Sequence, residues 1–221
     1  MTKYEVTNGE DGVNLIYRPK NYMLKLIPKP AGFPPERLDV HFVANLDHPD
    51  EFIVSESDLR TYLKHLSCLP INPNFQYLEI GAGLGEFTPF IADALHGRLK
   101  SRPIVIDLAD YELMKDMMAR ARELDISDAM KRYLSTLILR AQTILDPSKV
   151  DLINTPLSNT LKLRPDLEGI ADFAVDLFGA VNYYNVEIGN MEVSSRIELE
   201  RKISELERRF VKPGGQITQW N

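Results

Sequence analysis

Apolar stretches of strand length alternate with longer amphipathic stretches from about residue 75 onward. The five apolar stretches are 75–80, 102–107, 150–154, 172–178 and 215–220. Each is rich in aliphatic or aromatic residues and is short enough for a buried strand. Such alternation is typical of a parallel sheet covered by helices on both faces. The sequence therefore predicts an α/β fold for this part of the chain.

Three of the amphipathic stretches carry an apolar stripe at helical spacing. The stripes lie at 113–124, 130–144 and 199–210, and Ser127 is placed to cap the second helix. The methionines in the first two stripes are expected to pack in the core. The charged residues of the third stretch, RIELERKISELERR, are expected to form a solvated helix face. The sequence Pro-Gly-Gly at 213–215 predicts a stop between that helix and the last strand.

Residues 1–70 have a different pattern, with six prolines between positions 19 and 49 and only short apolar runs. We interpret most of this region as an extended, turn-rich lead segment. A helix is predicted over 57–66, with Ser57 or Asp58 as its N-cap and Pro70 after its end.

Composition narrows the class of protein. The 221 residues are 44% hydrophobic, and no apolar run approaches the ~20 residues that span a bilayer, so neither a disordered chain nor an integral membrane protein is expected. A net charge of −6 makes nucleic acid an unfavoured partner. The single Cys68 and four scattered histidines offer no metal-ligand spacing, so no metal is expected. The first residues mix charged and polar side chains, unlike a secretory signal, which predicts a cytoplasmic protein.

A glycine-rich loop follows the first strand of the α/β part. In the sequence LEIGAGLGE, Gly81, Gly83 and Gly85 allow a sharp turn and a close approach of the backbone to a ligand. A plain tight turn is the alternative. Glu86 stands where a dinucleotide-binding fingerprint has its third glycine, which disfavours a nucleotide-dependent oxidoreductase.

Two further carboxylates flank this loop in the predicted sheet. Glu79 precedes the first glycine, and it suits a ligand that carries cationic amino and sulfonium groups. Asp107 closes the second strand, where a carboxylate can accept hydrogen bonds from both hydroxyls of a ribose. The pattern predicts an adenosine site without phosphates.

These residues resemble the class I S-adenosylmethionine-dependent methyltransferase family. LEIGAGLG matches the family's acid-x-Gly-x-Gly-x-Gly motif, and Asp107 matches its second-strand acid, over about residues 75–221. The resemblance implies S-adenosylmethionine as the cofactor and a doubly wound Rossmann-like sheet of order 3-2-1-4-5. By the same resemblance the cofactor-binding residues are Glu79, Gly81, Ala82, Gly83, Gly85, Asp107, Leu108, Asn154 and Thr155.

The resemblance also gives these residues roles. Glu79 and the glycine loop would line the methionine end of the cofactor, Asp107 would hold the ribose, and Leu108 would pack on adenine. Asn154, with Thr155 beside it, would lie near the adenine amino group. Its alternative is a turn residue before a proline.

The end of the fourth strand is the predicted place for the chemistry, because the strand order reverses between the first and fourth strands. Asp176 is the candidate catalytic residue: it would orient the methionine amino group or a substrate, or accept a proton. A strand-end carboxylate that caps nearby N–H groups is the alternative. Phe178 and Tyr183 are candidate substrate residues, with core packing as their alternative.

The predicted function is methyl transfer by in-line displacement to a small-molecule or protein acceptor. A non-catalytic binding module or partner subunit of the same fold is one alternative. It follows from the chain's end after the fifth strand, where family members continue with a helix and two more strands. The chain is also a candidate to form a homo-oligomer. An RNA adenine methyltransferase is a weaker alternative, because DLFGAV replaces the family's Asn-x-Pro-aromatic motif after the fourth strand.

The predicted organisation has two parts. Residues 1–70 form an N-terminal extension, and residues 71–221 form the cofactor-binding domain without the usual last two strands. Relatives fold such extensions over the cofactor, so a lid role is one expectation, with Tyr17, Tyr22 and Phe33 as its aromatics. Plain packing against a sheet is the other.

Overall fold

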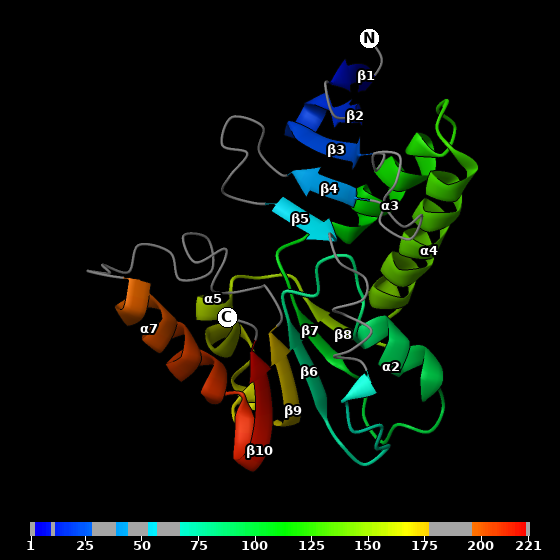
Figure 1. Ribbon diagram of the computed structural model, residues 1–221. Helices are drawn as coiled ribbons and strands as arrows, with labels where there is room; N and C mark the ends of the chain where they lie inside the picture. The colour runs from blue at the N-terminus through cyan, green and yellow to red at the C-terminus, as the bar shows by residue number, and fades with distance from the viewer. Residues whose placement is uncertain are drawn as a thin grey trace. The chain divides into compact units, whose positions relative to one another are not determined.

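The computed structural model describes residues 3–9, 12–27, 39–43, 53–56, 67–176 and 196–219. The chain divides into two compact units (Figure 1). One consists of Met1–Leu69 with Tyr111–Gln142, and the other of Pro70–Asp110 with Thr143–Asn221. We describe each unit separately.

The second unit contains a five-stranded parallel sheet. Its strands are β6 (Tyr77–Ile80), β7 (Ile104–Ile106), β8 (Asp151–Ile153), β9 (Ala171–Asp176) and β10 (Val211–Gln219). The order across the sheet is β8-β7-β6-β9-β10, and every neighbouring pair is parallel. Numbered along the chain, this is the predicted order 3-2-1-4-5. The α/β, Rossmann-like fold class is confirmed.

Helices cover both faces of this sheet. On one face, α5 (Leu157–Leu163) and α7 (Arg196–Arg208) contribute Leu157 and Ile203 to a core with Leu78 and Ala174 of the strands. On the other face, the ring of Tyr77 packs edge-on against Phe87, just before α2 (Thr88–Ala94). A short 3-10 helix (Pro165–Leu167) precedes β9. Burial on both faces explains why the strands read as short, nearly continuous apolar runs.

The last strand begins earlier than predicted. It pairs with β9 from Val211 onward, and a register shift before Gln216 places the Pro-Gly-Gly sequence in an irregular stretch of the strand. The backbone of Gly215 passes close to β9: a Cβ there would lie 3.0 Å from the carbonyl oxygen of Ala171 and 3.1 Å from that of Asp172. Glycine is required at this position because backbone atoms leave no room for a side chain.

We expect Gly215→Ala to destabilise the protein by about 1–3 kcal/mol, the usual cost of overpacking. Urea unfolding measures this loss. Gly97→Ala is the contrasting variant: Gly97 has a left-handed φ of 70° and open space around it, so it reports backbone strain without crowding, whereas Gly215 is crowded but not left-handed. A Gly215→Ala protein as stable as the wild type would contradict the close approach.

The first unit contains a five-stranded antiparallel sheet that the sequence analysis missed. Its strands are paired in chain order: β1 (Tyr4–Gly9), β2 (Gly12–Tyr17), β3 (Tyr22–Ile27), β4 (Asp39–Val43) and β5 (Ile53–Glu56). Buried Leu15, Leu24 and Phe42 form its core. The lead segment is thus not merely extended and turn-rich. The predicted helix over 57–66 lies outside the described residues.

Two amphipathic helices complete this unit. They are α3 (Tyr111–Ala121), which contacts β2 and β3, and α4 (Asp128–Leu145). The predicted stripes are confirmed, with Met114, Met117 and Leu134 among the buried residues. The Ser127 cap is confirmed as well, because its hydroxyl accepts a hydrogen bond from the Met130 N–H at 3.2 Å.

The tyrosines expected as lid aromatics pack within the first unit. Tyr17 lies 5.1 Å from Tyr4 between ring centroids, and Tyr22 lies 5.5 Å from Phe42. Phe33 is outside the described residues. No helix in the described part of the chain is long and apolar enough to cross a membrane.

Candidate functional site

The glycine loop after β6 has the backbone shape that glycine alone adopts easily. Gly81, Gly83 and Gly85 have φ values of 67°, 55° and 76°. The Gly81 N–H donates to the carbonyl of Ile106 at 2.9 Å, and the Gly85 N–H donates to the carbonyl of Ala82 at 2.8 Å. Left-handed backbone costs other residues about 1–2 kcal/mol each. The three glycines therefore set the shape of the loop, with buried Ala82 between the first two.

Asp107 joins this loop to the end of β7. Its side chain is 4% exposed. One carboxylate oxygen accepts the Gly83 N–H at 3.0 Å, and the other accepts the Ala109 N–H at 2.7 Å. A carboxylate has about four acceptor positions, so these bonds do not exclude ribose hydroxyls as further donors. The sequence placed the two motifs on neighbouring strands, and the structure links them directly.

Asn154, which directly follows β8, binds the turn after β7. Its side-chain amide donates to the carbonyl oxygens of Asp107 at 2.9 Å and Ala109 at 3.0 Å. Both amide hydrogens are thus engaged, which leaves the side-chain oxygen as the atom suited to an amino group such as that of adenine. Leu108 is half-buried and Thr155 is buried beside this turn.

Glu79 is a buried carboxyl group beside the loop, 4% exposed. It accepts the backbone N–H of Thr88 at 2.9 Å. Burial, opposed by hydrogen bonding from Thr88 and aided by the charges of Asp107 and Asp176, raises the pKa of Glu79 to about 7. Because Glu79 already occupies this N–H at the start of α2, the helix start is a poor site for a pyrophosphate.

Asp176 ends β9, the neighbour of β6, and is 4% exposed. Its carboxyl group lies beside that of Glu207 in α7. The expectation of a wholly solvated charged face on α7 is wrong at Glu207, which is completely buried. Its position was readable from the sequence: it lies four residues after Ile203 and eight after Leu199, on the apolar stripe.

Acidic side chains are buried at the edge of the sheet where the parallel strands end. The buried ionisable residues in the described part of the chain are all acidic: Glu79, Glu86, Asp107, Asp176 and Glu207. No Lys, Arg or His is buried there. The described residues also contain no group of three or more possible metal ligands with suitable geometry. The buried acidic groups favour a cationic ligand at this edge.

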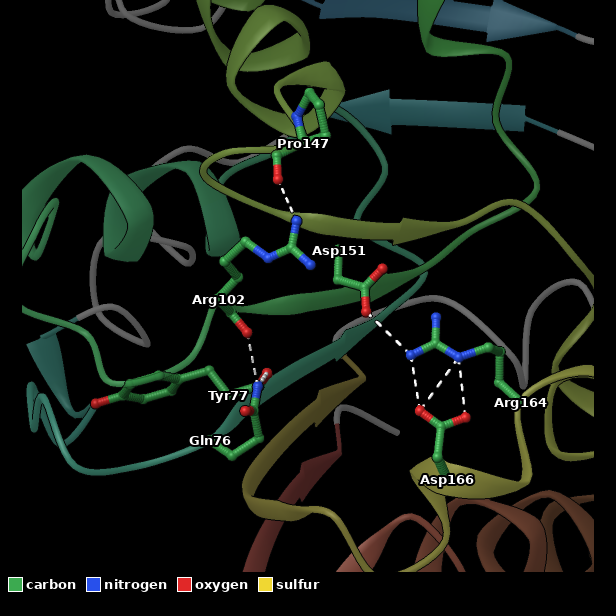
Figure 2. A network of polar contacts seen from close by, with 7 residues as sticks. All are labelled: Gln76, Tyr77, Arg102, Pro147, Asp151, Arg164 and Asp166. Atoms are coloured by element: carbon green, nitrogen blue, oxygen red, sulfur yellow. Dashed lines mark hydrogen bonds and ion pairs between the residues drawn. The ribbon is translucent and has the colours of Figure 1, made fainter.

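The opposite edge of the sheet carries the basic groups. Lys100, Arg102 and Lys149 line a hollow of about 220 Å³ near the starts of β7 and β8. Lys149 is paired with Asp93 at 2.8 Å. Figure 2 shows Arg102 donating to the carbonyl of Pro147. Lys149 and Arg102 thus contact the protein's own chain at this edge.

Figure 2 also shows Arg164 placed between two carboxylates near the start of β8. It contacts Asp166 at 2.8 Å and Asp151 at 3.2 Å. Hydrogen bonding from Arg164 lowers the pKa of Asp166. This arrangement ties the connection before β9 to β8.

The candidate substrate residues Phe178 and Tyr183 lie outside the described residues. The remaining candidates occupy three neighbouring strand ends, after β6, β7 and β8, with Asp176 at the end of β9. Glu207 is a buried carboxyl group at this edge that the sequence did not lead us to predict.

Comparisons with known proteins add little at the level of sequence. No family model and no curated protein matches the chain. Among solved structures, it matches the X-ray structure of YjhP from E. coli, a target of the Northeast Structural Genomics Research Consortium. The match has 16% identity and a TM-score of 0.36, and it covers 73% of this chain and 48% of that one. The chain thus spans about half the length of YjhP.

Proposed function

We propose that this chain is an S-adenosylmethionine-dependent methyltransferase that binds its cofactor at the carboxyl edge of the parallel sheet. One observation carries the proposal. Asp107 hydrogen-bonds to Gly83 of a loop with three left-handed glycines, within an edge whose buried ionisable groups in the described residues are all acidic.

The residues fit this cofactor better than a dinucleotide. S-adenosylmethionine carries a sulfonium and an ammonium group, which a buried acidic edge favours. A dinucleotide carries a pyrophosphate, which Glu79 and Glu86 would repel at the helix start. Asp107 would hold the ribose, Leu108 would contact adenine, and Glu79 would face the ammonium group.

The chain's own residues then act mainly by alignment. The bound cofactor supplies an activated methyl group for direct displacement. The rigid glycine loop and the Asp107 bridge would fix the methyl donor, and Asp176 would orient the amino group or the acceptor. A small molecule or a protein side chain is the proposed acceptor.

Thermal unfolding with S-adenosylmethionine, S-adenosylhomocysteine and NAD tests the proposal. At about one hundred times the dissociation constant, a ligand should stabilise the fold by ~2.7 kcal/mol, or several degrees. We expect such a shift with the two sulfur ligands and none with NAD. A shift with NAD alone would favour a dinucleotide enzyme, and no shift with any ligand would contradict the cofactor site.

A further inference from the structure

Glu207 is an unusual residue for a surface helix. The sequence around it is highly charged, and Arg201 and Glu205 of the same helix form an exposed ion pair. Glu207 is nevertheless 0% exposed. Figure 1 shows α7 alongside β9 and β10 of the parallel sheet. A fully buried carboxyl group is rare unless its polar atoms have partners.

The partners of Glu207 come from two neighbouring strands. One carboxyl oxygen accepts a hydrogen bond from the side-chain amide of Gln219 in β10, which also donates to the Ser204 hydroxyl at 3.2 Å. The other oxygen receives no N–H or hydroxyl donor among the described residues, and it faces the carboxyl group of Asp176. Gln219 and Asp176 are register partners in β10 and β9.

A hydrogen bond between two carboxyl groups needs a proton on one of them. Burial and the neighbouring Asp176 both raise the pKa of Glu207 strongly. Glu79 of β6 and Asp107, which follows β7, add further negative charge at this edge. Gln219 and Ser204 are neutral. Glu207 is 0% exposed against 4% for Asp176, so burial favours the proton on Glu207.

We propose that Glu207 is a positioning residue for Asp176: its neutral carboxyl group, held by Gln219, donates a hydrogen bond that fixes the Asp176 carboxylate at the end of β9. This proposal rests on the proposed function only in assigning Asp176 to the ligand site. It makes α7 and β10 part of the support for that site. An oriented Asp176 can then accept hydrogen bonds from an amino group or an acceptor.

Two substitutions separate positioning from plain packing. In Glu207→Gln the amide can still donate to Asp176 while its oxygen accepts from Gln219, so we expect S-adenosylhomocysteine to bind within about twofold of wild type. Glu207→Leu keeps the volume but cannot donate. Replacing a buried polar group by an apolar one often preserves stability, so Glu207→Leu should still fold. We expect it to bind S-adenosylhomocysteine at least about tenfold more weakly than wild type, because a charge-assisted hydrogen bond to Asp176 is lost. Glu205→Leu is the control on the exposed face.

Two readouts need no ligand. The infrared difference spectrum between the wild type and Glu207→Gln at neutral pH should show a protonated carboxyl band that only the wild type carries. Glu79, with a pKa of about 7, contributes its own band to both proteins, and that band cancels in the difference. The carboxyl carbon signal of Asp176 in NMR spectra should shift in Glu207→Leu and stay close to wild type in Glu207→Gln.

The outcomes are distinct. If Glu207→Leu binds S-adenosylhomocysteine as well as wild type and leaves the Asp176 signal unchanged, the positioning role is wrong. The absence of the infrared band would overturn the shared proton. If the wild type binds neither sulfur ligand, the proposed function fails, and the infrared and NMR results still decide the role of Glu207.

Discussion

Glu79→Gln will make the ligand-free protein more stable above about pH 7 and will abolish high-affinity binding of S-adenosylmethionine. The pKa of Glu79 is raised from 4.5 to about 7 in the folded protein. Between these pH values the unfolded chain has lost the proton and the folded chain keeps it. This contribution to stability is therefore complete below about pH 4.5 and is lost as the pH rises through 7. The loss amounts to about 3 kcal/mol at 1.36 kcal/mol per pKa unit.

Urea unfolding at about pH 5 and pH 8 measures this effect. Gln can still accept the Thr88 N–H but does not titrate, so the variant should lack that part of the wild type's loss between the two pH values. Glu168→Gln is the matched control, because Glu168 is exposed and paired with Arg209. If the wild type and Glu79→Gln respond equally to pH, the buried and protonated state of Glu79 is wrong.

Asp107→Ala will lower the free energy of unfolding by roughly 2–6 kcal/mol, at about 1–3 kcal/mol for each N–H left without an acceptor. The two N–H groups are those of Gly83 and Ala109. The same change should remove the stabilisation that S-adenosylhomocysteine gives, because the proposed ribose acceptor is lost and the glycine loop is released.

The ligand effect must be measured against each variant's own unfolding temperature without ligand, since Asp107 serves both the fold and the site. Asp166→Ala is the control: that carboxylate forms an exposed pair with Arg164 and should contribute about 0–1 kcal/mol. A full ligand-induced shift in Asp107→Ala would remove Asp107 from the site.

The parallel sheet could be predicted because burial on both faces leaves a local signal in the sequence. β7 (Ile104–Ile106) is a continuous apolar run, and β6 (Tyr77–Ile80) is apolar except for Glu79. The glycine loop needs backbone angles that only glycine adopts easily. The end of each strand then places its acid at one edge. Together with the strand order that the resemblance implies, these positions predicted that Glu79, Asp107 and Asp176 lie at the same edge of the sheet.

The antiparallel sheet was not predicted because the number of prolines in residues 1–70 favoured a turn-rich segment. The position of a proline relative to the strands matters more than the number of prolines. Pro19 lies in a short 3-10 helix between β2 and β3, where Asn21 makes the left-handed turn. The strands themselves are partly exposed, so their apolar residues form no continuous run. Their stability comes from pairing with neighbours and from α3, which follows far along the chain.

Glu207 was missed for a related reason. Its neighbours in the sequence are charged and exposed, while the atoms that explain its burial belong to Gln219 and Asp176. The sequence does show that Glu207 is a polar residue on an apolar helical stripe. It does not show that Gln219, at the end of another strand, is its hydrogen-bond partner.

Calorimetric titration of the wild type with S-adenosylhomocysteine and with adenosine, at about pH 6 and pH 7.5, tests the central claim most directly. If the ammonium group binds ionised Glu79, whose pKa is about 7, S-adenosylhomocysteine should bind one site roughly eightfold more tightly at the higher pH. Adenosine lacks the ammonium group, and its weaker binding should change little. Equal pH dependence for the two ligands would contradict the role of Glu79, and no binding of S-adenosylhomocysteine at either pH would contradict the cofactor site itself.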